Sequence, residues 1–171
     1  MDNVLFVMNM QELYAGKNRN KDKYPFNAED LTDKVNKCIA MYQPEEVFYI
    51  KSIGKGLFKG ALPKEGSKDA EFVTTMKVVS KNIYEKSKPD CFTNDSLHDF
   101  IRARNVKNIE FVGVDTGEEI GRSAFTATED MNIKVVYNEL AIIMMSPDKA
   151  AKYREKLRKT RVTFKQDWEE N

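Results

Sequence analysis

The side chains available for chemistry in this sequence are carboxylates, lysines, thiols and amides. The 171 residues contain one histidine, His98, and two cysteines, Cys38 and Cys91. Zinc and non-haem iron sites, and the Ser-His and Cys-His nucleophile pairs, usually require histidine. The sequence therefore predicts a site that works without histidine, and we expect His98 to lie on the surface.

The cysteines and a glycine-rich segment add no independent motif. Cys38 and Cys91 form no Cys-x-x-Cys pattern, so neither a disulfide framework nor a zinc knuckle is predicted, and helical spacing makes Cys38 a core residue. In Gly54-Lys55-Gly56 the lysine is not followed by the Ser or Thr of a phosphate-binding P-loop. We expect no nucleotide site over 54–68 and no cofactor.

The most informative polar residues follow an apolar run. Residues 109–114 predict a buried strand, which ends abruptly in Asp115-Thr116-Gly117-Glu118-Glu119. Open α/β sheets place their ligands at such strand-to-helix turns, at the carboxyl ends of the strands. The sequence therefore predicts a site around Asp115 and Glu119.

The elements that position this turn come from an alternation of short apolar runs and segments of helical periodicity. Strands are predicted over 4–8, 47–50, 109–114 and 133–137, with a stub at 83–84. Helices are predicted over 27–42, from 93 or 94 onward, over about 118–131, and from 146 onward. Residues 70–80 fit either a short helix or a strand. The pattern indicates a three-layer α/β/α sandwich with a mostly parallel sheet and the site at the carboxyl ends of strands one and four.

Composition limits the partners. Hydrophobic residues make up 41% and charged residues 32% of the chain, and the formal net charge is +1. We expect one domain over 1–171, a cytoplasmic protein, and neither nucleic acid nor membrane as a partner. The basic run 152–161 is predicted to be the solvated face of a helix rather than a nucleic-acid contact.

Three segments carry a family pattern. Residues 4–11 read VLFVMNMQ, residues 83–86 read IYEK with Phe92 and Leu97 following, and residues 113–124 read GVDTGEEIGRSA. In this order they resemble the isochorismatase-like cysteine hydrolases, which include nicotinamidases and other amidohydrolases. The family's first strand ends in hydrophobic-Asp-Met-Gln, its second segment carries a lysine, and its third reads Gly-Val-x-Thr-x-x-Cys-Val-x-x-Thr-Ala. The resemblance covers about residues 3–140.

The resemblance implies a catalytic Asp-Lys-Cys triad, in which the cysteine attacks the substrate and the aspartate handles its proton. Here Asn9 stands at the aspartate position, Lys86 at the lysine position and Glu119 at the cysteine position, with Lys81 or Lys88 as alternatives for the lysine. The Asp-x-His metal pattern of nicotinamidase-like members is missing, because residues 52–54 are Ser-Ile-Gly. The resemblance also implies a homo-oligomer. The implied pocket residues are Gln11, Cys91, Phe92, Val114, Asp115 and Thr116.

These replacements determine the predicted function. An amide cannot act as a general base, and a carboxylate is a poor nucleophile for amide hydrolysis. Asn9, Lys86 and Glu119 nevertheless sum to zero charge, as Asp, Lys and neutral Cys do, so a Lys86–Glu119 ion pair is expected. We predict a degenerate family member that binds a small metabolite or a protein partner through the old pocket.

One alternative stays open at this point. An active hydrolase on an amide or related small substrate could use a substituted site built on Lys86 and Glu119 as an acid/base pair. Cys91 could serve such a site as a relocated nucleophile, or it could be a small apolar residue that fills the core.

Overall fold

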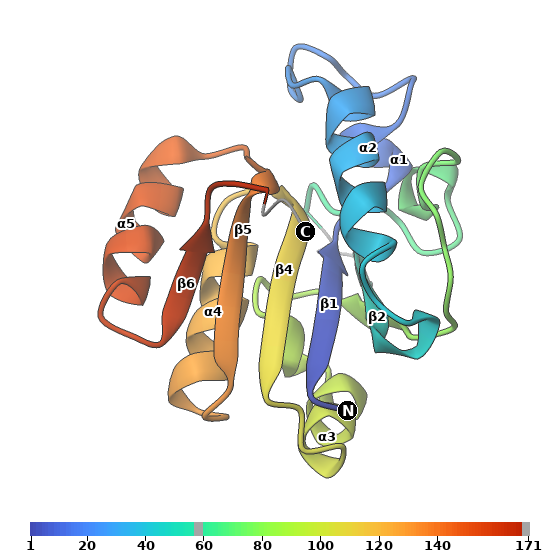
Figure 1. Cartoon of the computed structure of the whole chain (residues 1–171). Coiled ribbons are helices and arrows are strands. Elements are labelled where there is room, and N and C mark those ends of the chain that lie inside the picture. Colours follow the sequence, from blue (N-terminus) through green and yellow to red (C-terminus); the bar gives the residue numbers. More distant parts are fainter. Residues whose placement is uncertain (57–59, 169–171) are drawn as a thin grey trace.

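A six-stranded sheet forms the centre of the computed structural model, which describes residues 1–56 and 60–168 (Figure 1). The strand order is β3-β2-β1-β4-β5-β6 and every neighbouring pair is parallel. The strands are β1 (Asn3–Met8), β2 (Val47–Ser52), β3 (Ile83–Lys86), β4 (Asn108–Asp115), β5 (Lys134–Met144) and β6 (Val162–Lys165). The predicted parallel sheet is confirmed. Part of the segment 54–68, at 57–59, lies outside the described residues.

Helices cover both faces of the sheet, so the predicted three-layer sandwich is also confirmed. Figure 1 shows α2 in front of the sheet and α3 and α4 behind it, and α5 packs beside α4. The helices are α1 (Glu12–Ala15), α2 (Ala28–Ile39), α3 (Asp95–Ala103), α4 (Glu119–Glu129) and α5 (Pro147–Leu157). Within the described part of the chain, no helix is long and apolar enough to cross a membrane.

Burial on both faces explains why the strands are continuous apolar runs. In β1, Val4, Phe6 and Met8 join the core with α3 and α4, whereas Leu5 and Val7 join the core with α2. Cys38 lies in the α2 core with 1% exposure, as expected.

Helix caps set where two of the helices begin. The Asn27 side chain accepts a hydrogen bond from the Asp30 N–H, and the Asn94 side chain accepts one from the Leu97 N–H. Asparagine is among the residues preferred at this position because its oxygen satisfies an otherwise free N–H of the first turn. The cap predicted at Asn27 is confirmed, and Asn94 rather than Thr93 caps α3.

Two short elements and one ambiguous segment differ from the sequence prediction. Neither α1 nor β6 was expected, and residues 70–80 form neither a helix nor a strand: a 3₁₀ turn at Lys68–Ala70 is followed by irregular backbone. Elements of four residues, as α1 and β6 are, contain too few positions to establish a period.

The strand order reverses between β1 and β4. Connections from β1 lead toward β2 and β3, and connections from β4 lead toward β5 and β6, so the segments after β1 and β4 diverge. This reversal is the place where open parallel sheets bind ligands. Asn9 follows β1 there and Glu119 follows β4.

The close approach of β4 to β1 depends on Gly113, which has a φ of +113°. A Cβ at this position would lie 2.1 Å from the Met8 carbonyl oxygen. We expect Gly113→Ala to lower the free energy of unfolding by about 3 kcal/mol, because backbone strain and overpacking both oppose it. Chemical denaturation measures this.

Gly117→Ala is the matched control, because the nearest atom to its added Cβ would be Lys149 Cδ at 3.7 Å. Equal stability of the two alanine variants would contradict the close-approach explanation.

Candidate functional site

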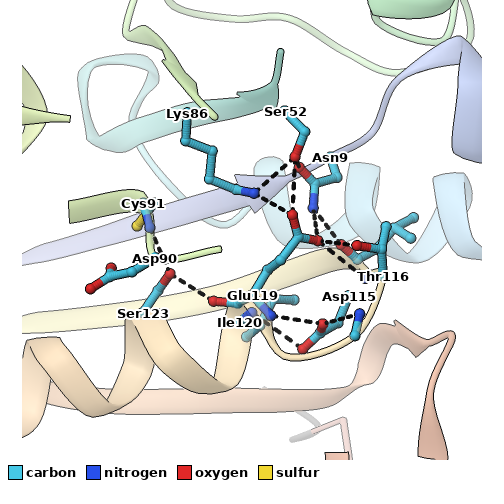
Figure 2. Close-up of polar contacts among 12 residues, drawn as sticks. Asn9, Ser52, Lys86, Asp90, Cys91, Asp115, Thr116, Glu119, Ile120 and Ser123 are labelled. Carbon is cyan, nitrogen blue, oxygen red and sulfur yellow. Dashed lines mark hydrogen bonds and ion pairs between the residues drawn. The ribbon is translucent and has the colours of Figure 1, made fainter. Parts of the chain in front are cut away.

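The Glu119 carboxylate is the centre of a polar cluster at the carboxyl edge of the sheet (Figure 2). Asn9 follows β1, Ser52 ends β2, Lys86 ends β3 and Glu119 is the first residue of α4. Ser52 and Lys86 are register partners in the β2–β3 pair, so their side chains leave the sheet at the same level. Four segments distant in sequence therefore converge on one carboxylate.

Polar groups surround both oxygens of this carboxylate. Lys86 Nζ forms an ion pair with Oε1, and Ser52 Oγ lies 3.1 Å from the same oxygen. Oε2 accepts from Asn9 Nδ2 at 2.8 Å, from the Thr116 N–H at 3.2 Å and from the Thr116 hydroxyl at 2.6 Å. These contacts fill nearly all the lone-pair directions that a carboxylate offers.

The neighbours of Asn9 explain why residue 9 is an amide. Its Nδ2 donates to the Val114 carbonyl at 2.9 Å as well as to Glu119. Both partners are acceptors, so a carboxylate at residue 9 would face them without a proton to share. The backbone of Asn9 has a φ of +54°, a conformation that asparagine tolerates better than most residues.

Ser52 connects the amide to the lysine. Its Oγ lies 2.7 Å from Asn9 Oδ1 and accepts from Lys86 Nζ at 2.8 Å. A hydroxyl has a single proton, and the shorter distance assigns it to Asn9 Oδ1 rather than to Glu119 Oε1. Ser52 was not predicted as a site residue. Its position beside Lys86 follows from the β2–β3 pairing, which the sequence alone does not show.

The cluster is closed to solvent. Only 1% of the Lys86 side chain and 7% of the Glu119 side chain are exposed, and Asn9 and Ser52 are fully buried. Burial alone would raise the pKa of Glu119, but the ion pair with Lys86 and the hydrogen bonds from Lys86 and Thr116 hold that pKa below its ordinary value. Glu119 is therefore ionised at neutral pH and committed to its internal partners.

A second carboxylate, Asp115, orients the first turn of α4. Asp115 Oδ1 accepts from the N–H groups of Gly117 and Glu119, at 2.9 and 3.0 Å, and Oδ2 accepts from that of Ile120 at 3.2 Å. Burial raises the pKa of Asp115, although these N–H groups and the helix dipole favour its ionised form. Asp115 thus fixes the backbone from which the Glu119 side chain projects.

The structure brings most of the predicted site residues together. Lys86, and not Lys81 or Lys88, contacts Glu119, and the two alternative lysines are exposed. Thr116 and Val114 contact the cluster as described. Gln11 fixes the backbone of Ser52, because its Oε1 accepts from the Ser52 N–H at 2.7 Å and its Nε2 donates to the Ser52 carbonyl at 3.0 Å.

Cys91 and Phe92 do not join the polar cluster. Both side chains lie in the hydrophobic core shared with α3 and α4, and Cys91 is fully buried. The Cys91 contact toward α4 is made by its backbone N–H, which donates to Ser123 Oγ at 3.0 Å. Burial raises the pKa of the Cys91 thiol to about 12, so it is not a thiolate at neutral pH.

His98 takes no part in the cluster's contacts. It lies on α3 with 30% of its side chain exposed, and its Nδ1 is 3.4 Å from Asp99 Oδ1. This placement on the flank of α3 agrees with the expectation from the sequence.

A parallel sheet with this strand order and a charged cluster at its reversal point define a doubly wound α/β protein. The family model of the isochorismatase domain matches residues 3–150, and the chain belongs to the isochorismatase family. The curated proteins contain no sequence that matches the chain.

Solved structures of the same fold cover nearly the whole chain at low identity. An isochorismatase-like hydrolase from Alkaliphilus metalliredigens aligns with a TM-score of 0.78 and 11% identity, covering 96% of this chain and 93% of the other. A nicotinamidase/pyrazinamidase from Bacillus subtilis gives 0.76 and 14%, covering 97% and 100%. An N-carbamoylsarcosine amidase from Thermoplasma acidophilum gives 0.75 and 17%, covering all of both chains. These likenesses establish the fold.

The residues at the cluster do not fit a metal ion. A pyrazinamidase of Pyrococcus horikoshii with this fold was solved in complex with zinc. Here β2 ends in Ser52, whose hydroxyl is used by Asn9 and Lys86, and the residues after it are Ile53 and Gly54. Among the described residues, no three His, Cys, Asp or Glu side chains are grouped to hold a metal. A zinc ion would also face the Lys86 ammonium.

Because Lys86 needs one buried carboxylate, we expect a carboxylate at residue 9 to compensate for the loss of the one at residue 119. We expect Glu119→Gln to lower the free energy of unfolding by about 3–5 kcal/mol, because it leaves the Lys86 charge buried without a partner. Asn9→Asp alone adds a carboxylate beside Glu119 and should cost about 2 kcal/mol. The double variant restores the charge balance and should be more stable than Glu119→Gln.

Denaturant unfolding measures the free energies of this cycle. Glu118→Gln is its control, because the partly exposed Glu118–Arg122 pair should contribute at most about 1 kcal/mol. Since the pKa of Glu119 is lowered on folding, its stabilisation is present above the ordinary value of 4.5 and is lost as the pH falls below it. The difference in the free energy of unfolding between the wild type and Glu119→Gln should therefore become smaller in acid. A structural ion pair would be contradicted if the effects of Asn9→Asp and Glu119→Gln on the free energy of unfolding were additive. It would also be contradicted if the stability difference between the wild type and Glu119→Gln did not depend on pH.

Proposed function

We propose that this isochorismatase-family protein lacks cysteine-type hydrolase activity and acts as a binding protein for a small polar metabolite. The observation that supports the first part is the Glu119 carboxylate. It stands where the family resemblance places the nucleophile, and it accepts from Lys86, Asn9 and both donors of Thr116.

Hydrolysis by the family route needs an open thiolate and a base beside it. Residue 119 carries no sulfur, residue 9 is an amide, and Cys91 is buried with a raised pKa. A hydrolase that used Lys86 and Glu119 instead would have to break a buried ion pair and admit substrate to a cluster with almost no exposed surface. The geometry therefore favours the degenerate interpretation over the substituted hydrolase.

The site that supports metabolite binding is a cavity of about 640 Å³ beside α1 and the start of α2. Its volume lies within the range of about 300–1,000 Å³ that is typical of small-molecule sites. Lys17, Arg19 and Lys21 line it together with Glu12 and Glu29. A ligand that carries both a positive and a negative group, such as an amino acid, matches this lining.

One wall of this cavity is held in place before any ligand binds. The Arg19 guanidinium donates to the carbonyls of Tyr24 at 3.1 Å and Gly16 at 3.3 Å, and it lies over the Phe26 ring. Arg19 therefore fixes the loop and leaves recognition of the ligand to Lys17 and Lys21. A preformed wall reduces the entropy lost on binding.

The activity test uses nicotinamide and N-carbamoylsarcosine, which the names of the similar structures suggest. We expect no ammonia release above the blank from the wild type or from Glu119→Gln. Turnover by the wild type that Glu119→Gln abolishes would establish the substituted hydrolase instead. Release by the Asn9→Asp/Glu119→Cys variant alone would show that only the triad has been lost.

The binding test is calorimetry with the twenty amino acids and their amides. We expect at least one to bind, and Lys17→Glu to weaken that binding at least about 10-fold because it reverses a charge at the cavity. Lys81→Glu, which changes an exposed lysine that does not line the cavity, is the control. A panel without a binder, or equal binding by Lys17→Glu, would contradict this site.

A further inference from the structure

A second cavity, of about 180 Å³, lies between α4, β5 and α5. Apolar side chains form most of its wall. They come from Met144 on β5 and from α5, which contributes Pro147, Ala150 and Leu157. Met144 is 39% exposed, so the cavity reaches solvent at the carboxyl end of β5. No residue of the Asn9–Lys86–Glu119 cluster lines this cavity.

The charged groups at this cavity are already neutralised within the protein. Asp115 accepts from the N–H groups at the start of α4, Glu118 pairs with Arg122 at 2.6 Å, and Arg154 pairs with Glu139. A charged ligand would find no free counter-charge among them and would lose its hydration on burial. The cavity therefore suits a neutral molecule.

Tyr137 is the exception to this internal pairing. Its side chain lines the cavity and is only 5% exposed; its hydroxyl is not fully enclosed and forms no hydrogen bond with the other described residues. Such a hydroxyl can donate a hydrogen bond to a ligand oxygen in place of water. Burial raises the pKa of Tyr137, so the group stays protonated and able to donate. The Phe164 ring, with its centroid 5.6 Å away, holds the Tyr137 ring in position.

The spacing of the two helices next to the cavity is set by Gly121. A Cβ on Gly121 would lie 2.7 Å from Tyr153 Cβ, so α4 and α5 already touch at this point. Helices in direct contact cannot move closer to fill the space beside them. The cavity is therefore a stable feature of the packing.

Size limits the ligand to one ring. Apolar cavities of about 150 Å³ bind benzene, and the present volume of about 180 Å³ adds room for one or two further atoms. Tyrosine rings and the Met144 thioether favour contacts with an aromatic edge. We propose that this cavity binds a neutral single-ring aromatic compound whose one oxygen accepts a hydrogen bond from the Tyr137 hydroxyl.

The test compares anisole with ethylbenzene, which has the same number of non-hydrogen atoms and no acceptor. Both are titrated into the full-length protein and followed by amide chemical shifts. We expect anisole to bind about 5-fold more tightly, which corresponds to one net hydrogen bond. Tyr137→Phe should remove this preference. Tyr153→Phe, which deletes a hydroxyl at the same cavity, should keep it.

Ala150→Leu fills the cavity and should abolish binding of both compounds, and a melting curve shows whether this variant folds. If it does not fold, the preference lost in Tyr137→Phe still decides the question. The proposal is overturned if neither compound saturates, if a folded Ala150→Leu binds as well as the wild type, or if Tyr137→Phe keeps the preference. Methoxycyclohexane that binds as tightly as anisole would overturn the aromatic part.

Discussion

The need to neutralise one buried ammonium group determines the arrangement of this site. Lys86 projects from the end of β3 into a region with almost no solvent, where an unpaired charge costs several kcal/mol. A carboxylate must therefore stand either at the end of β1 or at the start of α4. This chain places it at Glu119, and residue 9 is then an amide because a second carboxylate would lie within contact of the first. The charge at residue 119 therefore determines which residue type can stand at position 9.

The fold supplies donors at this point whatever residue 119 is. Four strands end at the same edge, and the backbone N–H of Thr116, in the turn between β4 and α4, points toward it. Groups of this kind stabilise developing negative charge when a substrate occupies the space between them. In this protein the Glu119 carboxylate occupies that space permanently. Donors that would serve catalysis in an open pocket here stabilise the native state, because the negative charge that they meet belongs to a side chain of the protein.

Sequence patterns predict the parts of this structure that depend on burial and local capping. Strands buried on both faces appear as apolar runs, and Asn27 and Asn94 provide the oxygen that begins a helix. Asn9 and Lys86 were predicted only because a family pattern fixes their order, whereas Glu119 also follows from the strand-to-helix turn after residue 114. Ser52 was missed because one serine at a strand end carries no signal until strand pairing places it beside Lys86. The place of Tyr137 beside the second cavity likewise depends on how α5 packs, which no local pattern records.

A sealed cluster changes where this fold can recognise a ligand. The two cavities lie on opposite sides of the strand reversal, one lined by Glu12 after β1 and the other by Asp115 at the end of β4. Each of these residues is close to the cluster, because Gln11 holds Ser52 and the Asp115 carboxylate accepts the Glu119 N–H. The buried ion pair thus ties together the two segments that carry the cavities. A rigid cluster is therefore compatible with ligand binding on either side of it, since a cavity keeps its shape only when the backbone beside it is fixed.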